Sequence, residues 1–502
     1  MSSIRYHEAA GQKSVSSYLT SHLSLELLQH LSQLYSMTFK DLKALHLLIG
    51  SAIAQLESRF QECGEDYPAL DSSYQDSTVD LLSQDLQVLN LSNQIVAAAG
   101  HVIAIVRSPF NTVVHTGMAF LLSVSLREVE AAHVVEILRA AGQKGLPIQE
   151  IAACTGRDPS KLGHVLRFLA THHIFKEVHP NVFANNRISS YIDTKKDVNA
   201  IMSSTASNWK YMGTSGMAAF VAVAGDEFLK SAAHLSEVMR DTDWGQSRLP
   251  TETAFNAAWS THKGFFEFMQ EDRNKPRMER LGHALMATEQ FSKAGSIIEC
   301  FPWKTLSDAA VVVDVGGGSG RSMQILAERF DHLECFVQDL PRVCEIGRKI
   351  MGSTFKVAFQ DHNFFDPQPI RNASVFYLRT ILHDWSDTHA ISILRHLRNA
   401  AQPRTRLIIA EHLLISACHD VKGESLLEHP VFGAGPKAPL LRNLGIARST
   451  AYMLDLNMQI MFNGQERMLD EMTHLVNISG WKIESVHSAE FSLFTHFVAA
   501  PA

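Results

Sequence analysis

A glycine-rich segment in the second half of the chain has the residue types to hold a small ligand. It reads Val311-Val-Val-Asp-Val-Gly-Gly-Gly-Ser-Gly320 and leads into a predicted helix from Arg321 to Phe330. The pattern predicts a buried strand, a tight turn and a helix. Glycine accepts positive φ and leaves bare backbone for a ligand to approach, so the turn is a candidate binding loop. Its glycines are Gly316, Gly317, Gly318 and Gly320.

Three kinds of ligand compete for this turn. A phosphate-binding NTPase loop requires Gly-Lys-Ser/Thr at a set distance from an earlier glycine, and the chain has Gly320-Arg321-Ser322 without that spacing. A dinucleotide fingerprint starting at Gly316 requires Gly or Ala at the place of Arg321. S-adenosylmethionine has no pyrophosphate, and its ribose hydroxyls favour an acidic residue at the end of the next strand. Asp339 ends that predicted strand, so the pair favours a nucleoside-bearing cofactor of the third kind.

A histidine at the end of another predicted strand is the candidate base. The strand is Val375-Phe-Tyr-Leu-Arg-Thr-Ile-Leu382, and it leads directly into His383-Asp-Trp-Ser-Asp387. Catalytic groups collect at the carboxyl ends of strands in open α/β sheets, which favours His383 over an ordinary core or solvent histidine. Two acids could orient its ring: Glu411 at a predicted strand end and Glu466 at a predicted helix start. Taken singly, a solvated strand end and a first-turn carboxylate explain these acids equally well.

The elements around these residues change character along the chain. Strands alternate with helices from Ala309 onward, which is typical of a parallel α/β sheet. Between Gln143 and Tyr191, two short helices and a hairpin predict a winged helix. This module is only modestly basic, so a platform for pairing two chains explains it better than DNA binding. The first part of the chain and the stretch around 205–290 are predicted to be helical.

The composition is that of a globular protein with large cores. The chain has 502 residues, 46% of them hydrophobic, and a net charge of −7, which argues against a general nucleic-acid coat. Six dispersed cysteines with no Cys-x-x-Cys pair argue against a disulfide framework or a cysteine-rich zinc module. The start lacks a secretory pattern, and the apolar run from Ile95 to Val106 is shorter than the ~20 residues that span a bilayer. We therefore expect a soluble, cytoplasmic protein.

Four motifs together resemble those of a known family. They are Asp314-Val-Gly-Gly-Gly-Ser-Gly320, Gln338-Asp-Leu-Pro341, Leu382-His-Asp-Trp-Ser-Asp387 and Asn463-Gly-Gln-Glu-Arg467. They are similar to motifs of small-molecule O-methyltransferases of the plant caffeate and isoflavone type, most closely of their fungal relatives in secondary metabolism. The resemblance covers roughly residues 85–500. It implies an α/β fold, in which a Rossmann-like S-adenosylmethionine-dependent methyltransferase domain is preceded by an α-helical winged-helix dimerisation domain.

The pattern along the chain and the resemblance together predict a division of the chain. The expected parts are residues 1–80, a helical N-terminal extension; 81–205, the winged-helix dimerisation domain; 206–290, a helical connector lining the substrate pocket; and 291–502, the S-adenosylmethionine-binding catalytic domain.

By the same resemblance, His383 is the catalytic base and Glu411 and Glu466 flank it. A phenol has a pKa of ~10 and is a poor nucleophile until it loses its proton, which a neutral imidazole with a reference pKa of ~6.5 can accept at physiological pH. A carboxylate on the other ring nitrogen fixes the tautomer and stabilises the imidazolium that forms. This scheme requires no metal, and the sequence shows no convincing metal-ligand cluster beside the glycine loop.

The resemblance assigns the cofactor site as well. The glycine loop and Asp339 would hold the methionine and ribose parts. Asn363 and Phe364 would meet the adenine, and Arg379 would line the site. The family usually has an acidic residue at the place of Asn363. Since Asn keeps a carbonyl acceptor but has no charge, we expect cofactor binding to survive, in weakened form.

The acceptor pocket is expected to be apolar and aromatic, closed by the helices before the α/β domain. Met286 matches a family position that packs on the substrate, and the weaker candidates are Trp259, Phe266 and Met458. The segment from Leu426 to Ile446 is rich in Pro and Gly and predicts a long irregular loop, which either covers the pocket or lies on the surface.

These observations favour a homodimeric O-methyltransferase that acts on a hydroxyl of a small aromatic or polyketide-like metabolite and binds neither nucleic acid nor membrane. Two alternatives stay open. The same scaffold could methylate a carboxyl or a nitrogen, which would depend less on His383. The chain could also be a catalytically silent regulatory or binding protein, but the joint presence of His383, Glu411 and Glu466 argues against that.

Overall fold

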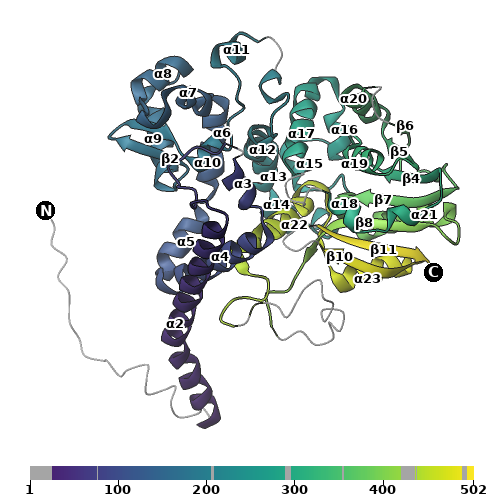
Figure 1. Cartoon of the computed structure of the whole chain (residues 1–502), viewed down its shortest axis with the longest axis horizontal. Helices are drawn as coiled ribbons and strands as arrows, with labels where there is room; N and C mark the ends of the chain where they lie inside the picture. Colours follow the sequence, from purple (N-terminus) through teal and green to yellow (C-terminus); the bar gives the residue numbers. More distant parts are fainter. Residues whose placement is uncertain are drawn as a thin grey trace.

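The computed structural model describes residues 25–75, 77–204, 208–288, 295–352, 356–419, 436, 438–488 and 494–502. Figure 1 shows a mainly helical half, formed by the earlier part of the chain, beside an α/β half that carries a twisted sheet. The predicted change from helices to alternating strands and helices therefore coincides with the change from one half of the molecule to the other.

Two long helices form the N-terminal part. Helix α2 (Leu25–Glu62) packs along α4 (Leu86–Val106), and Ala52, Leu56 and Val88 are buried between them. The short α3 (Thr78–Leu82) is capped by Ser77, whose hydroxyl accepts a hydrogen bond from the Asp80 N–H. The predicted N-terminal helix also extended over residues before Leu25, which lie outside the described residues.

The far end of α4 contacts a segment inserted in the α/β half. Leu440 is buried against Leu45 and Ala98, next to a short 3-10 helix, η10 (Gly445–Arg448). A side chain at Gly100 would meet the Cγ2 atom of Ile446 at 2.4 Å, so this contact is close. Most of the long loop predicted from Leu426 to Ile446 lies outside the described residues, and its described end packs on the N-terminal helices.

The next two helices differ in burial. Helix α5 (Pro109–Gly117) is largely exposed and has no buried residue, whereas α6 (Phe120–Ala131) is mostly half-buried, with Ser125, Val129 and Glu130 buried. By length and composition alone, two helical stretches, 86–106 and 109–131, could cross a membrane, a test that core helices of soluble proteins also pass. The first stretch begins well before the apolar run considered in the sequence, which is why that run was judged too short.

The predicted helices and hairpin of the next region are present. Helices α7 (Val134–Ala141), α8 (Ile148–Thr155) and α9 (Pro159–Thr171) are followed by strands β2 (Phe175–His179) and β3 (Val182–Asn185). Strand β1 (Leu146–Pro147) completes a small antiparallel sheet in the order β1-β3-β2. The Asp158 carboxylate caps α9 by accepting from the Lys161 N–H.

A helical connector links this region to the sheet. Its helices are α10 (Arg187–Ser190), α11 (Val198–Ser203), α12 (Met217–Val223), α13 (Leu229–Ala232), α14 (Leu235–Arg240), α15 (Ala254–Trp259), α16 (Phe265–Met269), α17 (Lys275–Thr288) and α18 (Ser296–Glu299). One π-helical turn, Ala224–Phe228, separates α12 from α13.

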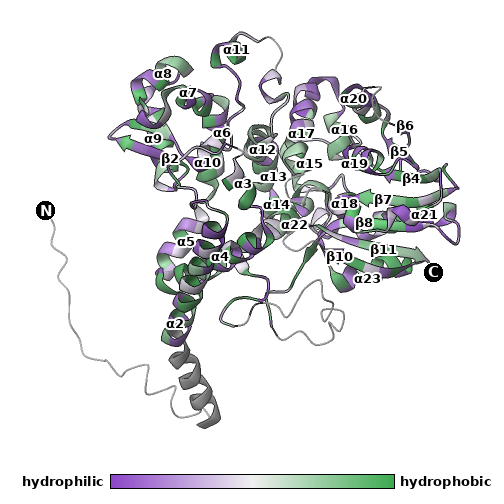
Figure 2. Ribbon diagram, in the orientation of Figure 1, coloured by the Kyte–Doolittle hydropathy of each residue, from purple (hydrophilic) through white to green (hydrophobic). Residues whose placement is uncertain are grey.

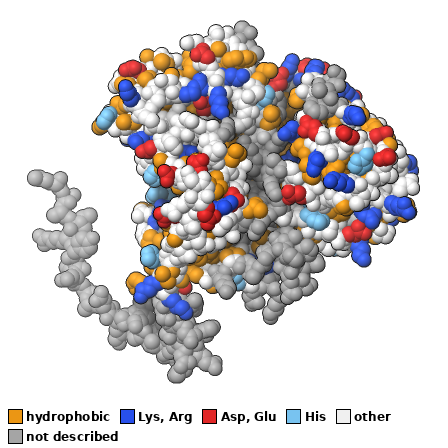
Figure 3. Space-filling view, in the orientation of Figure 1, with side chains coloured by type: hydrophobic (Ala, Val, Ile, Leu, Met, Phe, Trp, Pro, Cys, Tyr) orange, Lys and Arg blue, Asp and Glu red, His pale blue; other side chains and the backbone are white. Residues whose placement is uncertain are grey.

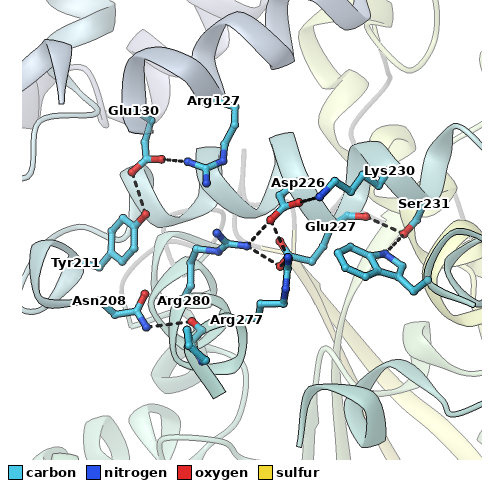
Figure 4. A network of polar contacts seen from close by, with 12 residues as sticks. Arg127, Glu130, Asn208, Tyr211, Asp226, Glu227, Lys230, Ser231, Arg277 and Arg280 are labelled. Atoms are coloured by element: carbon cyan, nitrogen blue, oxygen red, sulfur yellow. Dashed lines mark hydrogen bonds and ion pairs between the residues drawn. The ribbon is translucent and has the colours of Figure 1, made fainter. Parts of the chain in front are cut away.

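A buried charge network joins this π-helical turn to α17 (Figure 4). The Glu227 carboxylate accepts hydrogen bonds from Arg277 at 2.5 Å and Arg280 at 2.6 Å, and its residue is 1% exposed. Asp226 contacts Lys230 and the same two arginines, and these cations hold its pKa far below its usual value despite its burial. The two acids and the two arginines thus form ion pairs with one another in a region that is largely removed from water.

The α/β half contains one mixed sheet. Its strands are β4 (Ala310–Val315), β5 (Leu333–Asp339), β6 (Val357–Asp361), β7 (Ala373–Arg379), β8 (Arg406–Leu414), β9 (Arg467–Met468), β10 (Trp481–Ser488) and β11 (Phe494–Pro501). The order is β10-β11-β8-β7-β4-β5-β6, with β9 paired to β8. Its helices are α19 (Arg321–Arg329), α20 (Pro341–Met351), α21 (Asp387–Ala400), α22 (Ser449–Phe462) and α23 (Leu469–Ile478).

Helices cover both faces of this sheet, and alternate residues of each strand enter different cores. Val313 and Val315 pack with residues of α21 and α23 on one face. Val312, between them, packs with Met323 of α19 on the other. Figure 2 shows strands β7 and β8 as predominantly hydrophobic, as expected when both faces are covered. Burial of each such aliphatic side chain contributes about 1.5–3 kcal/mol to folding.

Candidate active site

The topology of the sheet predicts a ligand-binding crevice at the carboxyl ends of β4 and β7. The chain proceeds from β4 to β5 and β6 on one side, and returns to β7 and β8 on the other side of β4. The connections that leave β4 and β7 therefore diverge, which is where open α/β sheets bind their ligands. The glycine loop follows β4, and His383 follows β7 in the single turn of 3-10 helix Leu382–Asp384.

The glycine loop is held in a conformation that few other residues could adopt. Gly316 and Gly320 have φ angles of 76° and 84°. A Cβ atom at Gly320 would lie 2.6 Å from the Met351 side chain, and one at Gly317 would lie 2.6 Å from the buried Asp314 carboxylate. Gly318, by contrast, faces open space. The loop is thus packed tightly at its base and open at its tip.

Asp339 lies beside the tip of this loop. Its Oδ2 accepts a hydrogen bond from the Gly318 N–H at 2.9 Å, and its Oδ1 accepts from the Leu340 N–H at 2.7 Å. Burial raises the pKa of its carboxyl. The sequence-predicted pairing of the loop with this acid is therefore a direct contact.

The other predicted cofactor residues are spread along the same edge. The Phe364 ring lies 3.5 Å from the place of a Cβ atom on Gly316 and stands edge-on to the Trp385 ring. Asn363 is exposed, and its Oδ1 accepts from the Phe365 N–H at 3.1 Å. The Arg379 guanidinium lies over the Phe494 ring, 4.9 Å from its centre. Asn363 thus already uses its carbonyl oxygen in a local turn.

Three carboxylates surround the His383 ring. Its Nδ1 lies 2.7 Å from Glu466 Oε1 and 3.8 Å from Glu411 Oε2, while its Nε2 lies 3.6 Å from Asp384 Oδ1. An ionised carboxylate only accepts hydrogen bonds, so Nδ1 carries a hydrogen and donates it to Glu466. The structure therefore brings the three predicted catalytic residues together. It adds Asp384, which sequence reasoning passed over although it is the next residue in the motif.

These charges reverse the effect of burial on the base. Burial by itself lowers the pKa of His383, but Glu466, Glu411 and Asp384 together raise it to about 10. The pKa of Asp384 is raised to about 7, chiefly by burial. The three carboxylates therefore favour the protonated form of the ring in the free protein. This differs from the neutral imidazole expected from the reference pKa, because the sequence does not show how many carboxylates meet at the ring.

The two flanking glutamates are held differently from the way the sequence suggested. Strand β8 continues to Leu414, so Glu411 lies inside the strand, and its Oε1 accepts from the N–H groups of Ile381 and Leu382. Glu466 lies between α22 and β9 rather than in the first turn of a helix, and its N–H donates to Asp455 Oδ1 at 2.9 Å. No signal in the sequence singled out Asp455, because its role depends on a contact with a different segment.

In each of the two flanking glutamates, only one carboxylate oxygen forms a hydrogen bond among the described residues. Glu411 Oε2 and Glu466 Oε2 are buried and have no hydrogen-bond partner among the described residues. With His383 they offer three ligand atoms within 4.8 Å of one another, a donor set that a divalent cation could also use. The hydrogen bond from His383 to Glu466 matches a base and its orienting acid, and this reading needs no ion.

The four predicted substrate residues fall in different surroundings. Phe266 stacks on Phe462, with ring centres 5.4 Å apart, at the end of α22 that leads towards the base. Met458 is buried within α22. Trp259 donates from Nε1 to Ser231 and lies under the Arg277 guanidinium, which belongs to the buried charge network. Met286 is 46% exposed on α17. The structure thus places two of the four on or against α22.

Comparisons with known proteins place the chain in one family. Residues 233–432 match the model of the O-methyltransferase domain family. An O-methyltransferase of Armillaria gallica is 36% identical over 92% of this chain and 99% of its own length. The 4-O-methyltransferase 1 of Phanerochaete chrysosporium is 35% identical over 89% of this chain and 96% of its own length. A solved complex of LepI with S-adenosylmethionine superposes with a TM-score of 0.63 at 17% identity, covering 85% of this chain and 99% of LepI, which shows a shared fold.

The fold and crevice are those of an α/β enzyme that binds a nucleoside cofactor at the switch point of its sheet. The chain belongs to the O-methyltransferase family of the plant type, and it is an S-adenosylmethionine-dependent methyltransferase.

A glycine beside the base gives a first test of the geometry. A Cβ atom at Gly464 would lie 2.1 Å from the His383 carbonyl oxygen, and Gln465 N–H donates to that same oxygen. We expect Gly464→Ala to displace the turn that carries His383, to lower stability by about 1–3 kcal/mol and to lower kcat. Chemical denaturation and a methyl-transfer assay would measure these effects.

Gly282→Ala is the matched control for this variant. Gly282 lies within α17, and no atom lies within 4 Å of its Cβ position. Alanine there should stabilise the helix by roughly 0.5–1 kcal/mol and leave kcat unchanged. Wild-type kcat in Gly464→Ala would show that the close approach of these two backbones does not matter for the base.

Proposed function

We propose that the protein transfers the methyl group of S-adenosylmethionine to a hydroxyl of a small aromatic or polyketide-like metabolite, with His383 as the general base. The observation that carries this proposal is the buried His383–Glu466 hydrogen bond, which follows the carboxyl end of β7, the strand next to the one that leads into the glycine loop. This bond occupies Nδ1 and leaves Nε2, which lies 3.6 Å from Asp384 Oδ1, as the ring nitrogen that can take a proton from an acceptor.

The residues of the crevice fit the cofactor of the family. The open tip of the glycine loop at Gly318 leaves room beside the Asp339 carboxylate, which has free lone pairs for ribose hydroxyls. Trp385 Nε1 is buried and has no hydrogen-bond partner among the described residues, and its ring lies against Phe364 on the same edge. When bound, the cofactor would supply an electrophilic methyl group. Phe364 and Trp385 would offer apolar ring faces and edges to its base.

The protein itself contributes a proton acceptor, the His383 ring, whose protonated form is stabilised by the carboxylates around it. His383 Nε2 would take the acceptor's hydroxyl proton, while Nδ1 keeps its hydrogen bond to Glu466. The imidazolium that results is the form that Glu466 and Glu411 stabilise. The backbone N–H groups of Ile381 and Leu382 hold Glu411 in place throughout.

Replacement of the base tests the proposal directly. We expect His383→Ala to lower methyl transfer by 10²-fold or more, about the contribution of a positioned general base. The Kd for S-adenosylmethionine, measured by calorimetry, should change little, because His383 lies across the crevice from the glycine loop. His474→Ala, an exposed histidine on α23, is the matched control and should behave as wild type.

The choice of acceptor separates the alternatives. A panel of phenolic acids offers a hydroxyl and a carboxyl in the same molecule, and mass spectrometry distinguishes a methyl ether from a methyl ester. Ether products that disappear in His383→Ala support the proposal. Ester products that survive this substitution would assign the scaffold to a carboxyl acceptor, and cofactor binding without any turnover would favour a silent binding protein.

The raised pKa of His383 predicts an unusual pH dependence. The base acts only when Nε2 is unprotonated, so kcat/KM should still be rising with pH above neutrality rather than levelling near the ~6.5 of an ordinary histidine. Glu466→Gln removes one of the charges that raise this pKa, so it should shift the rising limb to lower pH. The acceptor's own ionisation is common to both proteins and cancels. An unshifted limb would show that another group controls it.

We also infer that the protein is a homodimer paired through its exposed apolar helices. Val106 is 63% exposed, Phe110 76% and Val113 72%, all within one stretch that spans the end of α4 and α5. Contiguous exposed apolar surface of this kind marks an interface. A second copy of the chain is the partner that the family resemblance suggests. On the face drawn in Figure 3, positive and negative side chains are interspersed, which does not resemble a nucleic-acid footprint.

Light scattering after size exclusion tests this pairing. The wild type should have the mass of two chains, and Phe110→Asp should shift it to one because a buried charge is costly at an interface. Ile350→Asp is the control, since Ile350 is 66% exposed on α20, outside the apolar stretch. A monomeric wild type, or a Phe110→Asp variant that stays dimeric, would contradict the inference.

A further inference from the structure

Arg467, the last residue of the fourth motif, forms several hydrogen bonds that have no part in the proposed proton transfer. Its side chain is 1% exposed, an unusual position for a guanidinium. Nη1 donates to the Leu382 carbonyl at 2.9 Å, and Nη2 donates to the Trp385 carbonyl at 2.9 Å. Nε and Nη2 both donate to Asp387 Oδ1, at 3.1 and 2.9 Å. All of these acceptors belong to one short segment.

That segment is the turn that carries the base. The carbonyls of Leu382 and Trp385 bracket His383 and Asp384, so a planar guanidinium that bonds to both fixes the height and the tilt of the turn. Arginine suits this task because its donors form a rigid fork, whereas a lysine ammonium is a compact point charge on a flexible stem. The acceptors are mostly backbone carbonyls, so the contact depends on the shape of the turn more than on charge.

The position of Arg467 in the chain links this clamp to the orienting acid. Glu466, directly before it, receives the hydrogen bond from His383 Nδ1. Gln465, one residue earlier, donates from its backbone N–H to the His383 carbonyl at 2.8 Å and from its side chain to Asp387. The three consecutive residues Gln465, Glu466 and Arg467 therefore bind the base, the turn that carries it and the start of α21. Movement of one would move the others.

We propose that Arg467 is a positioning residue for methyl transfer, which holds the His383 turn at the distance where Glu466 can orient the imidazole. This inference rests on the proposed function, since it assigns importance to the geometry of His383. Arg467 does not touch the reacting atoms. It acts by setting where the base and its acid meet, and a misplacement of about 1 Å at a catalytic group can cost 10²-fold in rate.

The test compares Arg467→Lys with Arg398→Lys. Arg398 also donates to backbone carbonyls, those of Gly480 and Ala502, but at the far edge of the sheet, so it matches the chemistry without contacting the base. We expect Arg467→Lys to lower kcat by at least about 10-fold and to change the Kd for S-adenosylmethionine less than about 3-fold. Arg398→Lys should keep the wild-type kcat even where its melting temperature falls.

The pH profile separates positioning from a merely structural role. Glu466, Glu411 and Asp384 face the ring of His383 and raise its pKa, and the His412 ring lies 6.2 Å away. A loosened Glu466 contact should move the rising limb of kcat/KM to lower pH in Arg467→Lys and leave it unmoved in Arg398→Lys. Added guanidinium at millimolar concentration should restore part of the kcat of Arg467→Ala, where the cavity can accept it.

A second substitution keeps the test open if loss of the guanidinium prevents folding. Asp387 is 59% exposed at its side chain, so Asp387→Ala should fold and still weaken the clamp, with a few-fold loss of kcat. A wild-type kcat and pH profile in Arg467→Lys would overturn the inference. A lower melting temperature and weaker cofactor binding would also overturn it if kcat per folded active site stayed unchanged. Full activity in His383→Ala would instead overturn the proposed function, and the two failures are therefore distinguishable.

Discussion

The imidazole buried among three carboxylates is the constraint on which the rest of this structure depends. His383 is 9% exposed, Glu411 1% and Glu466 3%. Removal of such ions from water costs several kcal/mol each, and only close partners offset that cost. The carboxylates raise the pKa of His383 to about 10, so the ring and the acids compensate one another as ions. The same field favours the imidazolium that would form when an acceptor hydroxyl loses its proton.

This arrangement requires two segments far apart in sequence to meet within a few ångströms. His383 and Glu466 are separated by 83 residues, and β8 and α22 lie between them in the chain. The sheet fixes one side, because β7 ends at the turn and the N–H groups of Ile381 and Leu382 bind Glu411. The backbone contact of Gln465 with His383 and the fork of Arg467 fix the other.

Much of the site was predictable because it depends on local pattern. Strand β4 leads directly into a run of glycines, which predicts a tight turn after it. Parallel strands bring their carboxyl ends to one edge of the sheet, so the glycine loop, Asp339 and His383 were expected at the same edge. The paired helices and hairpin between Gln143 and Tyr191 followed from their caps and turn residues in the same way. The surroundings of Trp259 and Met286 did not follow, because an aromatic or a methionine at helical spacing packs equally well in a core, a pocket or a charge network.

The sequence by itself determined the class of the protein, its α/β fold and its cofactor, and it pointed to the proposed base, because these depend on motifs whose residue types allow few alternatives. Only the tertiary structure decided the direction in which the pKa of His383 shifts, the contacts of Asp384 and Arg467, and the packing of Leu440 on the N-terminal helices. A pKa depends on distances to every nearby charge, and those distances are set by side-chain directions and by contacts between remote segments. Neither the side-chain directions nor the contacts between remote segments can be deduced from the spacing of residues along the chain.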